Sequence, residues 1–308
     1  MKLYFGQINI GNAEFFKQSG KEYHSIEIEK SPHFQLLKGD EKAYKYYLEK
    51  SWGSVRPKQN SEKDRDNQVK KFKNLFKEIK ENGTKKPIVV CEYKDRKIIV
   101  DGNHRAAINA FLKKEAPEIK ISVIDYIKKI TENSAEFYGT KNKGIPYQTI
   151  SDGGNILLKG RRSDLADRMK LIDKKDMAGK IVADIGCNIG MAAFMAVDNG
   201  AKESVGLDVS GKLVTAALRI NVLFGKPCEF IKADFSKKQE IKADTAFAFS
   251  INAHINNNKM LAENLKNFNV VYFETHQGSE IPREVVAEFE QEFRGAIGER
   301  KLYRLLKK

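Results

Sequence analysis

The chain has 308 residues, of which 41% are hydrophobic, and its 55 basic and 41 acidic residues give a formal net charge of +14. This length predicts two ordinary domains that each bury a core, and the lack of any apolar run of 18 or more residues excludes a transmembrane helix. Because the amino terminus lacks an apolar segment followed by a small-residue cleavage site, we expect a cytoplasmic protein.

The first part of the chain alternates short apolar runs with charged helical stretches. Residues 61–83 place apolar side chains at helical intervals and predict an amphipathic helix that ends at Gly83. The other elements expected here are two strands, a helix and a third strand, at residues 87–91, 97–100, 106–114 and 119–127. Residues 128–160 are rich in glycine and predict a loop-rich junction, so we place the domain boundary between residues 132 and 133.

A polar pentapeptide, Asp101-Gly102-Asn103-His104-Arg105, lies between a predicted strand and a predicted helix. Gly102 permits the tight turn, and amides at a helix N-terminus together with Arg105 form a natural phosphate cradle. A simple turn with a helix cap is the alternative interpretation. The segment resembles the DGxHR signature of the ParB/sulfiredoxin-like superfamily, over roughly residues 20–128.

That resemblance implies a nucleotide-binding domain that takes ATP, ADP or CTP with Mg, and a phosphotransferase or nucleotidase as a second activity. The predicted nucleotide-binding residues are those of the pentapeptide, Asp101, Gly102, Asn103, His104 and Arg105. Asn103 stands where sulfiredoxins have a reactive cysteine, which excludes their chemistry. No evident helix-turn-helix follows the domain, which argues against a DNA clamp.

From residue 163 onward, strands and helices alternate. Helices are expected at residues 165–171, 191–199 and 212–224. Strands are expected at residues 180–185, 204–208, 228–233, 245–250 and 270–274. The pattern predicts an α/β fold, with a Rossmann-like, doubly wound parallel sheet in residues 133–308 after a smaller α+β domain in residues 1–132.

A glycine-containing turn, Asp184-Ile-Gly186-Cys-Asn188-Ile-Gly190, follows the first of these strands and opens a helix. Glycine removes the Cβ that would keep a ligand away from the backbone, and the amides of the helix N-terminus attract a carboxylate. The pattern is DxGxxxG and not the GxGxxG of dinucleotide-binding folds. A NAD-binding domain, or a turn with two packing glycines, is the alternative.

Acidic residues follow the next two strands, at the edge of the sheet where α/β proteins bind ligands. Asp208, followed by Val209, suits ribose hydroxyls, and Asp234 with Phe235 suits an adenine ring. The three pieces together resemble class I S-adenosylmethionine (SAM)-dependent methyltransferases over roughly residues 136–308. The resemblance implies SAM as cofactor, held by Asp184, Gly186, Asn188, Gly190, Asp208, Val209, Asp234, Phe235 and Ser250. It places Gly186 and Gly190 against the methionine part of SAM, and Asp184 near its amino group.

The fourth strand runs into Ser250-Ile-Asn-Ala-His254, which lacks the prolines and the aromatic residue of the [DNS]PP[YFW] motif of base-modifying amino-methyltransferases. Pro227-Cys228 precedes the third strand and so does not match a cytosine-5 nucleophile. Both observations argue against base methylation. His254 and His276 are the candidate general bases, because imidazole titrates near neutral pH, with rim histidines of no chemical role as the alternative.

The lead-in to this domain, with Tyr147-Gln148, residues 159–162 and Asp167-Arg168, looks like that of small-molecule and glycan methyltransferases. O-methylation of a small molecule or a glycan, with polysaccharide modification as the matching role, is therefore the first hypothesis. Cys91, Cys187 and Cys228 are few and contain no CxxC pair, so neither disulfides nor a metal site are predicted.

Two other functions stay open. The basic charge favours a ParB-like DNA-binding module joined to a nucleic-acid methyltransferase, but lysines spread along the whole chain are more simply explained as a solvated surface. Nucleic acid is therefore an allowed but not a favoured partner. A methyltransferase fold that acts only as a SAM sensor is the other alternative, and the oligomeric state is left open.

Overall fold

A computed structural model describes residues 2–55, 57–135, 145–252 and 254–308. The chain forms two compact units, Met1–Ile130 with Leu218–Gly225, and Thr131–Ala217 with Lys226–Lys308. The predicted boundary lies two residues beyond the observed one. The prediction also placed Leu218–Gly225 in the second domain, whereas these residues pack with the first unit. Within the described ranges, no helix combines the length and the apolarity that a membrane crossing needs.

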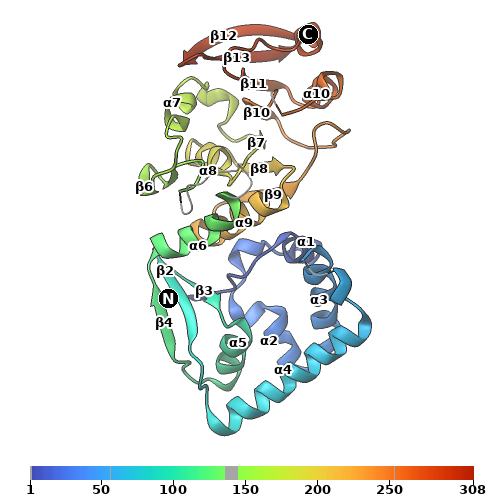
Figure 1. Cartoon of the computed structure of the whole chain (residues 1–308), viewed down its shortest axis with the longest axis vertical. Helices are drawn as coiled ribbons and strands as arrows, with labels where there is room; N and C mark the ends of the chain where they lie inside the picture. Colours follow the sequence, from blue (N-terminus) through green and yellow to red (C-terminus); the bar gives the residue numbers. More distant parts are fainter. Residues whose placement is uncertain (1, 56, 136–144, 253) are drawn as a thin grey trace. The chain divides into compact units, whose positions relative to one another are not determined.

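The first unit contains a four-stranded sheet in the order β1-β3-β2-β4. Its strands are β1 (Lys2–Tyr4), β2 (Ile88–Tyr93), β3 (Arg96–Asp101) and β4 (Glu118–Ile121). Its helices are α1 (Ile10–Gln18), α2 (Pro32–Leu37), α3 (Glu41–Val55), α4 (Glu62–Asn82) and α5 (Asn103–Leu112), with α6 (Val123–Ala135) at its end. Helix α5 lies between the sheet and helices α2 and α4 (Figure 1). The amphipathic helix predicted at residues 61–83 is confirmed as α4, which Ser61 caps.

The strand predicted at residues 119–127 is wrong beyond Ile121, because helix α6 starts at Val123. The Ser122 hydroxyl accepts a hydrogen bond from the Asp125 amide at 3.0 Å and donates to the Asp125 carboxylate at 2.6 Å. Tyr126, Ile127 and Ile130 are then buried at helical spacing. The Ser-x-x-Asp signature of a helix start therefore outweighs the β-branched composition of this segment.

The second unit is built on a seven-stranded sheet in the order β12-β13-β11-β10-β7-β8-β9. Its five parallel strands are β7 (Ile181–Ile185), β8 (Glu203–Asp208), β9 (Cys228–Lys232), β10 (Thr245–Phe249) and β11 (Val270–Glu274). The connecting helices are α7 (Leu165–Lys170), α8 (Met191–Asp198), α9 (Gly211–Phe224), α10 (Asn258–Leu265) and α11 (Arg283–Glu288). These strands confirm the predicted parallel sheet.

Two features of this unit differ from the prediction. Strands β12 (Phe289–Ile297) and β13 (Arg300–Lys307) form an antiparallel hairpin, and β13 pairs antiparallel with β11. The junction expected to be loop contains a second hairpin, β5 (Ile150–Asp152) and β6 (Asn155–Leu158), around Gly153 and Gly154. The sheet is therefore mixed at one edge.

Alternate residues of the central strands face two cores, so both sides of this sheet are buried. On β10, Ala246 and Ala248 belong to one apolar cluster, whereas Phe247 belongs to the other with Tyr272 of β11. Strands β8 and β9 are added to one side of β7, and β10 and β11 are added to its other side, so the strand order reverses between β7 and β10. Open α/β sheets bind ligands at such a switch point. The second unit is therefore an α/β, Rossmann-like domain.

Candidate functional site

A cavity of about 620 Å³ opens at the carboxyl ends of the central strands of the second unit. This volume lies within the range of small-molecule and cofactor sites. The predicted residues that line it are Asp184, Gly186, Asn188, Asp208, Val209, Asp234, Phe235, Ser250, His254 and His276. Gly190 is the predicted site residue of this unit that does not line it.

The two glycines of the turn after β7 have different surroundings. Gly186 has a φ of 75°, and a Cβ on it would lie 2.8 Å from the Ile251 side chain. Gly190 has a φ of 86° and precedes α8, where a Cβ would lie 2.4 Å from the Phe230 ring. Gly186 thus borders the cavity, whereas Gly190 lets the start of α8 pack against β9. The resemblance implied that Gly190 lies beside the methionine part of SAM, and this packing position differs from that expectation.

Asp208 is held by the backbone at the tip of β8. One carboxylate oxygen accepts a hydrogen bond from the Ser210 amide at 2.8 Å, and the other accepts from the Asn188 amide at 2.9 Å. Burial raises the pKa of this carboxyl above its ordinary value, against these two donors. Because a carboxylate oxygen can accept a second bond, the orientation is fixed while acceptor capacity for ligand hydroxyls remains.

Asp184 has a buried carboxylate oxygen, Oδ2, for which the described residues provide no hydrogen-bond partner. Burial raises the pKa of Asp184 to about 7, and the neighbouring Asp208 charge acts in the same direction. An unpaired buried carboxylate is costly unless a donor or cation joins it. Its place in the lining of the cavity therefore fits a ligand that brings a cationic amine.

The side chains after β8 and β9 offer an apolar surface beside a fixed acid. Val209 is 55% exposed, whereas Phe235 is 5% exposed and packs in a core cluster. Asp234 accepts hydrogen bonds from the Ser236 amide at 3.0 Å and hydroxyl at 2.6 Å, which hold its pKa below the ordinary value. Val209 thus offers a flat ring more accessible surface than Phe235.

A buried ion cluster lines the opposite side of the cavity, and sequence reasoning missed most of it. Arg168 donates to both oxygens of Asp164 at 3.0 Å and, through Nε, to Glu274 at the end of β11. The Ser250 hydroxyl also donates to Glu274. Burial raises the pKa of Glu274 to about 7. A charged residue that ends the apolar strand Val270–Glu274 was the available signal for this group.

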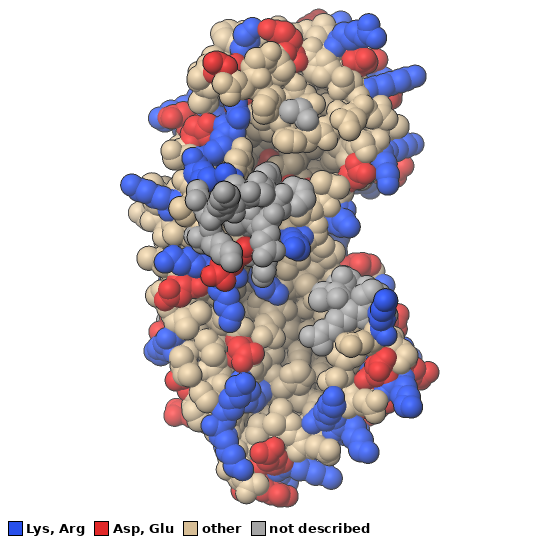
Figure 2. Space-filling view, in the orientation of Figure 1, with Lys and Arg blue, Asp and Glu red and all other residues tan. Residues whose placement is uncertain are grey.

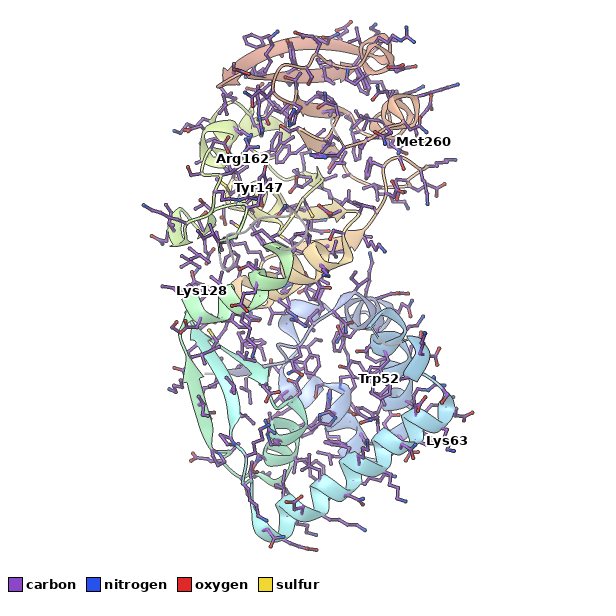
Figure 3. The ribbon with its side chains drawn as sticks, in the orientation of Figure 1. Trp52, Lys63, Lys128, Tyr147, Arg162 and Met260 are labelled. Atoms are coloured by element: carbon purple, nitrogen blue, oxygen red, sulfur yellow. The ribbon has the colours of Figure 1, made fainter. Side chains whose placement is uncertain are left out.

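Two further arginines flank this cluster. Arg162 donates to the Tyr147 hydroxyl at 3.0 Å and to Asp164 at 2.5 Å. Arg162 and Tyr147 lie close together before α7 (Figure 3). Arg300 of β13 donates to the Ser250 hydroxyl at 3.2 Å and lies 3.6 Å from a Glu274 oxygen. The antiparallel strand that was not predicted therefore contributes a cation to the cavity.

The two candidate bases, His254 and His276, lie at the rim. Their ring centroids are 6.4 Å apart, and the His254 side chain is exposed while that of His276 is half-buried. The His276 amide donates to the Asn252 side chain at 3.1 Å. Both side chains contribute to the lining of the cavity.

The first unit contains a cavity of about 540 Å³, which three residues of the predicted nucleotide site line, Asp101, Asn103 and His104. Gly102 has a φ of 95° and caps α5, and it does not line the cavity. Arg105 also lies outside the lining and donates to Asp101 at 3.1 Å. The structure therefore pairs the expected phosphate-binding cation with an acid of its own turn.

Two histidines meet in this cavity. Burial lowers the pKa of His104 to about 4 and that of His33 well below its ordinary value, and the two rings lie 4.6 Å apart. His104 shares a hydrogen bond with the Tyr44 hydroxyl at 3.0 Å. The Asn103 amide nitrogen donates to Gln7 at 2.9 Å, while its buried oxygen has no partner among the described residues. The described ranges contain no group of three or more His, Cys, Asp or Glu residues arranged for a metal ion.

Comparison with known proteins gives a short sequence match. No protein-family profile matches the chain. Ribosomal protein L11 methyltransferase of Mannheimia succiniciproducens is 39% identical over 66 residues, which are 21% of this chain and 22% of that protein. The chain thus matches about a fifth of the length of this curated relative.

Solved methyltransferase structures are similar to about half of the chain. Ribosomal protein L11 methylase from Lactobacillus delbrueckii subsp. bulgaricus is 22% identical, covers 48% of this chain and 81% of its own, and has a TM-score of 0.41. Magnesium protoporphyrin IX methyltransferase from Synechocystis PCC 6803, solved with bound SAM, is 16% identical, covers 46% and 77%, and has a TM-score of 0.39. WbdD, described as a bifunctional kinase-methyltransferase, is 18% identical, covers 48% and 40%, and has a TM-score of 0.40. These likenesses concern the fold of about half the chain.

Proposed function

We propose that the second unit is a SAM-dependent methyltransferase whose cofactor lies in the cavity at the tips of β7, β8 and β9. The observation that carries this proposal is the buried, unpartnered oxygen of Asp184 next to Gly186 and the oriented carboxylate of Asp208. A ligand with an amine for Asp184, ribose hydroxyls for Asp208 and a flat base for the apolar surface at Val209 fits this side of the cavity.

Each residue then has a definite role. Asp184 meets the amine of the methionine part, the turn at Gly186 and Asn188 admits its backbone, and Asp208 accepts from the ribose hydroxyls. Val209 and Phe235 flank the base, and Asp234 lies at its edge. When bound, SAM supplies an electrophilic methyl group, and the chain's own task is to align an acceptor atom with it.

We propose an oxygen atom of a small molecule or glycan as the methyl acceptor. The sequence after β10 lacks the motif that grips the amine of a nucleobase, and the lead-in around Tyr147 and Arg162 is similar to that of glycan-modifying enzymes. His254 and His276 are placed at the rim to take the proton that an acceptor hydroxyl loses on methylation. Modification of a polysaccharide precursor is the corresponding cellular role.

Calorimetric titration with SAM tests the cofactor site. Replacing Asp208 by Ala removes a buried acceptor for the ribose hydroxyls, and we expect a loss of about 1–3 kcal/mol, or roughly 5- to 150-fold in affinity. Asp101→Ala, in the corresponding strand–turn–helix of the first unit, is the matched control and should leave SAM affinity unchanged. Unchanged SAM binding by Asp208→Ala, or no binding by the wild type, contradicts the proposal.

Nucleic acid is the second candidate acceptor because the chain has a net charge of +14. On the face seen in Figure 2, however, basic and acidic side chains are interspersed over both units. A salt titration of DNA binding separates the two candidates, since each phosphate contact contributes a slope near −0.9 in a plot of log affinity against log salt. A flat response favours the small-molecule or glycan acceptor.

A further inference from the structure

The charged groups of the methyltransferase cavity are divided between its two sides. Carboxylates without arginine partners lie near the carboxyl ends of β7, β8 and β9, at Asp184, Asp208 and Asp234. Arginines lie on the side of β10, β11 and β13, at Arg162, Arg168 and Arg300. Because the sheet order places β9-β8-β7 and β10-β11-β13 on opposite sides of the switch point, this division is built into the topology.

The arginine side has more positive than negative charge. Its three guanidinium groups face two carboxyl groups, those of Asp164 and Glu274. One positive charge is left over even when both carboxyls are ionised. Burial raises the pKa of Glu274 to about 7, so partial protonation near neutral pH increases this surplus.

The three arginines differ in their exposure and in how many of their N–H groups already donate a hydrogen bond. Arg168 is 7% exposed and is bonded through Nε and both Nη atoms to the two carboxyl groups. Arg162 and Arg300 are 19% and 18% exposed, and Arg300 reaches Glu274 only at 3.6 Å. Arg168 therefore has a structural role in the lining of the cavity, whereas Arg300 and Arg162 keep N–H donors that a ligand in the cavity can reach.

We propose that the methyl acceptor carries an anionic oxygen group, a carboxylate or a phosphate ester, that Arg300 and Arg162 bind while the cofactor occupies the acidic side. The inference rests on the proposed SAM site. A guanidinium group binds such oxyanions through paired, charge-assisted hydrogen bonds. The acidic side attracts a cationic sulfonium and the arginine side repels it, so the two ligands are sorted to opposite sides before they react.

Inorganic phosphate and acetate serve as probes of this site in the full chain saturated with S-adenosylhomocysteine, with binding followed by calorimetry. We expect millimolar affinity for at least one of them in the wild type. Arg300→Gln should weaken it at least about tenfold, the loss of one charge-assisted hydrogen bond, and Arg300→Lys should restore part of it. A preference for phosphate indicates a phosphate ester acceptor, and a preference for acetate indicates a carboxylate.

Arg283→Gln is the matched control, because Arg283 is 94% exposed and lies outside the cavity lining, and it should leave anion binding unchanged. S-Adenosylhomocysteine affinity is measured first for every variant and reports that the variant is folded. If the wild type does not bind S-adenosylhomocysteine, the proposed function itself is overturned. Normal S-adenosylhomocysteine binding with no affinity for either anion, or with equal affinity in Arg300→Gln, overturns only the anionic acceptor.

Discussion

The two cavities of this protein form at the same local motif, yet the aspartate of that motif is paired in one cavity and keeps an unpaired oxygen in the other. In each unit a buried strand runs through a left-handed glycine into a helix, at Gly186 after β7 and at Gly102 after β3. In the second unit the carboxylate of Asp184, near the end of the strand, keeps an oxygen without a partner among the described residues. In the first, Asp101 accepts from Arg105 at 3.1 Å and Gln7 at 3.4 Å.

The two turns differ in the length of chain between this glycine and the helix. The turn of the second unit continues to Gly190 before α8 starts, and this leaves backbone and a buried acid beside an open cavity. In the first unit α5 starts at Asn103, directly after Gly102, and its Arg105 side chain folds back onto the turn. The acid of this motif therefore keeps an oxygen open to a ligand in the second unit, whereas in the first unit it is already bonded to an arginine of the same turn.

The largest effect should come from the ion cluster that lines the cavity of the second unit. Arg168→Leu leaves the buried Glu274 and the half-buried Asp164 without their shared cation, and we expect a loss of about 3–5 kcal/mol in the free energy of unfolding. Lys170→Leu, which breaks the exposed Lys170–Asp167 pair on the same helix, is the control and should change stability little. Urea denaturation measures both. Equal stability of the two variants contradicts a structural role for the cluster.

A smaller effect concerns the pH dependence of stability. The pKa of Asp184 is about 7 in the folded chain and near 3.8 in the unfolded chain, so the folded state binds the extra proton. Stability should therefore fall as the pH rises from about 4 through 7. Asp184→Asn removes this titration, and the variant should gain about 2 kcal/mol relative to the wild type between pH 5 and pH 8.

Chemical denaturation of both proteins at several pH values checks this expectation. Asp101→Asn alters the corresponding acid of the first unit, which is paired with Arg105, and serves as the control. A constant difference between Asp184→Asn and the wild type across this range would show that the Asp184 carboxyl already has a partner.

The smallest effect tests whether the cavity of the first unit takes a nucleotide. We propose ATP, ADP or CTP with Mg as its ligand, as the resemblance of Asp101–Arg105 implies. Because Asn103 lines the cavity and Arg105 does not, Asn103→Ala should weaken nucleotide binding by about 1 kcal/mol, whereas Arg105→Ala should change it less. Calorimetry measures both, and the opposite order would return the phosphate-binding role to Arg105.

Local sequence determined the central elements of the sheet in the second unit. Strands β7 and β8, helix α8 and the glycine turn between them follow from apolar runs broken by Gly186 and Gly190, and the structure has them at the expected places. Asp184 and Asp208 come together because parallel strands end at one edge. These features depend on contacts within a few residues or on one rule of sheet geometry, so a pattern in the chain is sufficient to predict them.

Tertiary structure alone decided the acceptor side of the cavity and the limits of the two units. Arg168 meets Glu274 across 106 positions of sequence, and Arg300 reaches the cavity only because β13 pairs antiparallel with β11. Leu218–Gly225 pack with the first unit although they continue a helix predicted for the second. Ion pairs and strand pairing between distant segments leave no periodic signal in the chain, because the partners are chosen by the folded geometry and not by their neighbours in sequence.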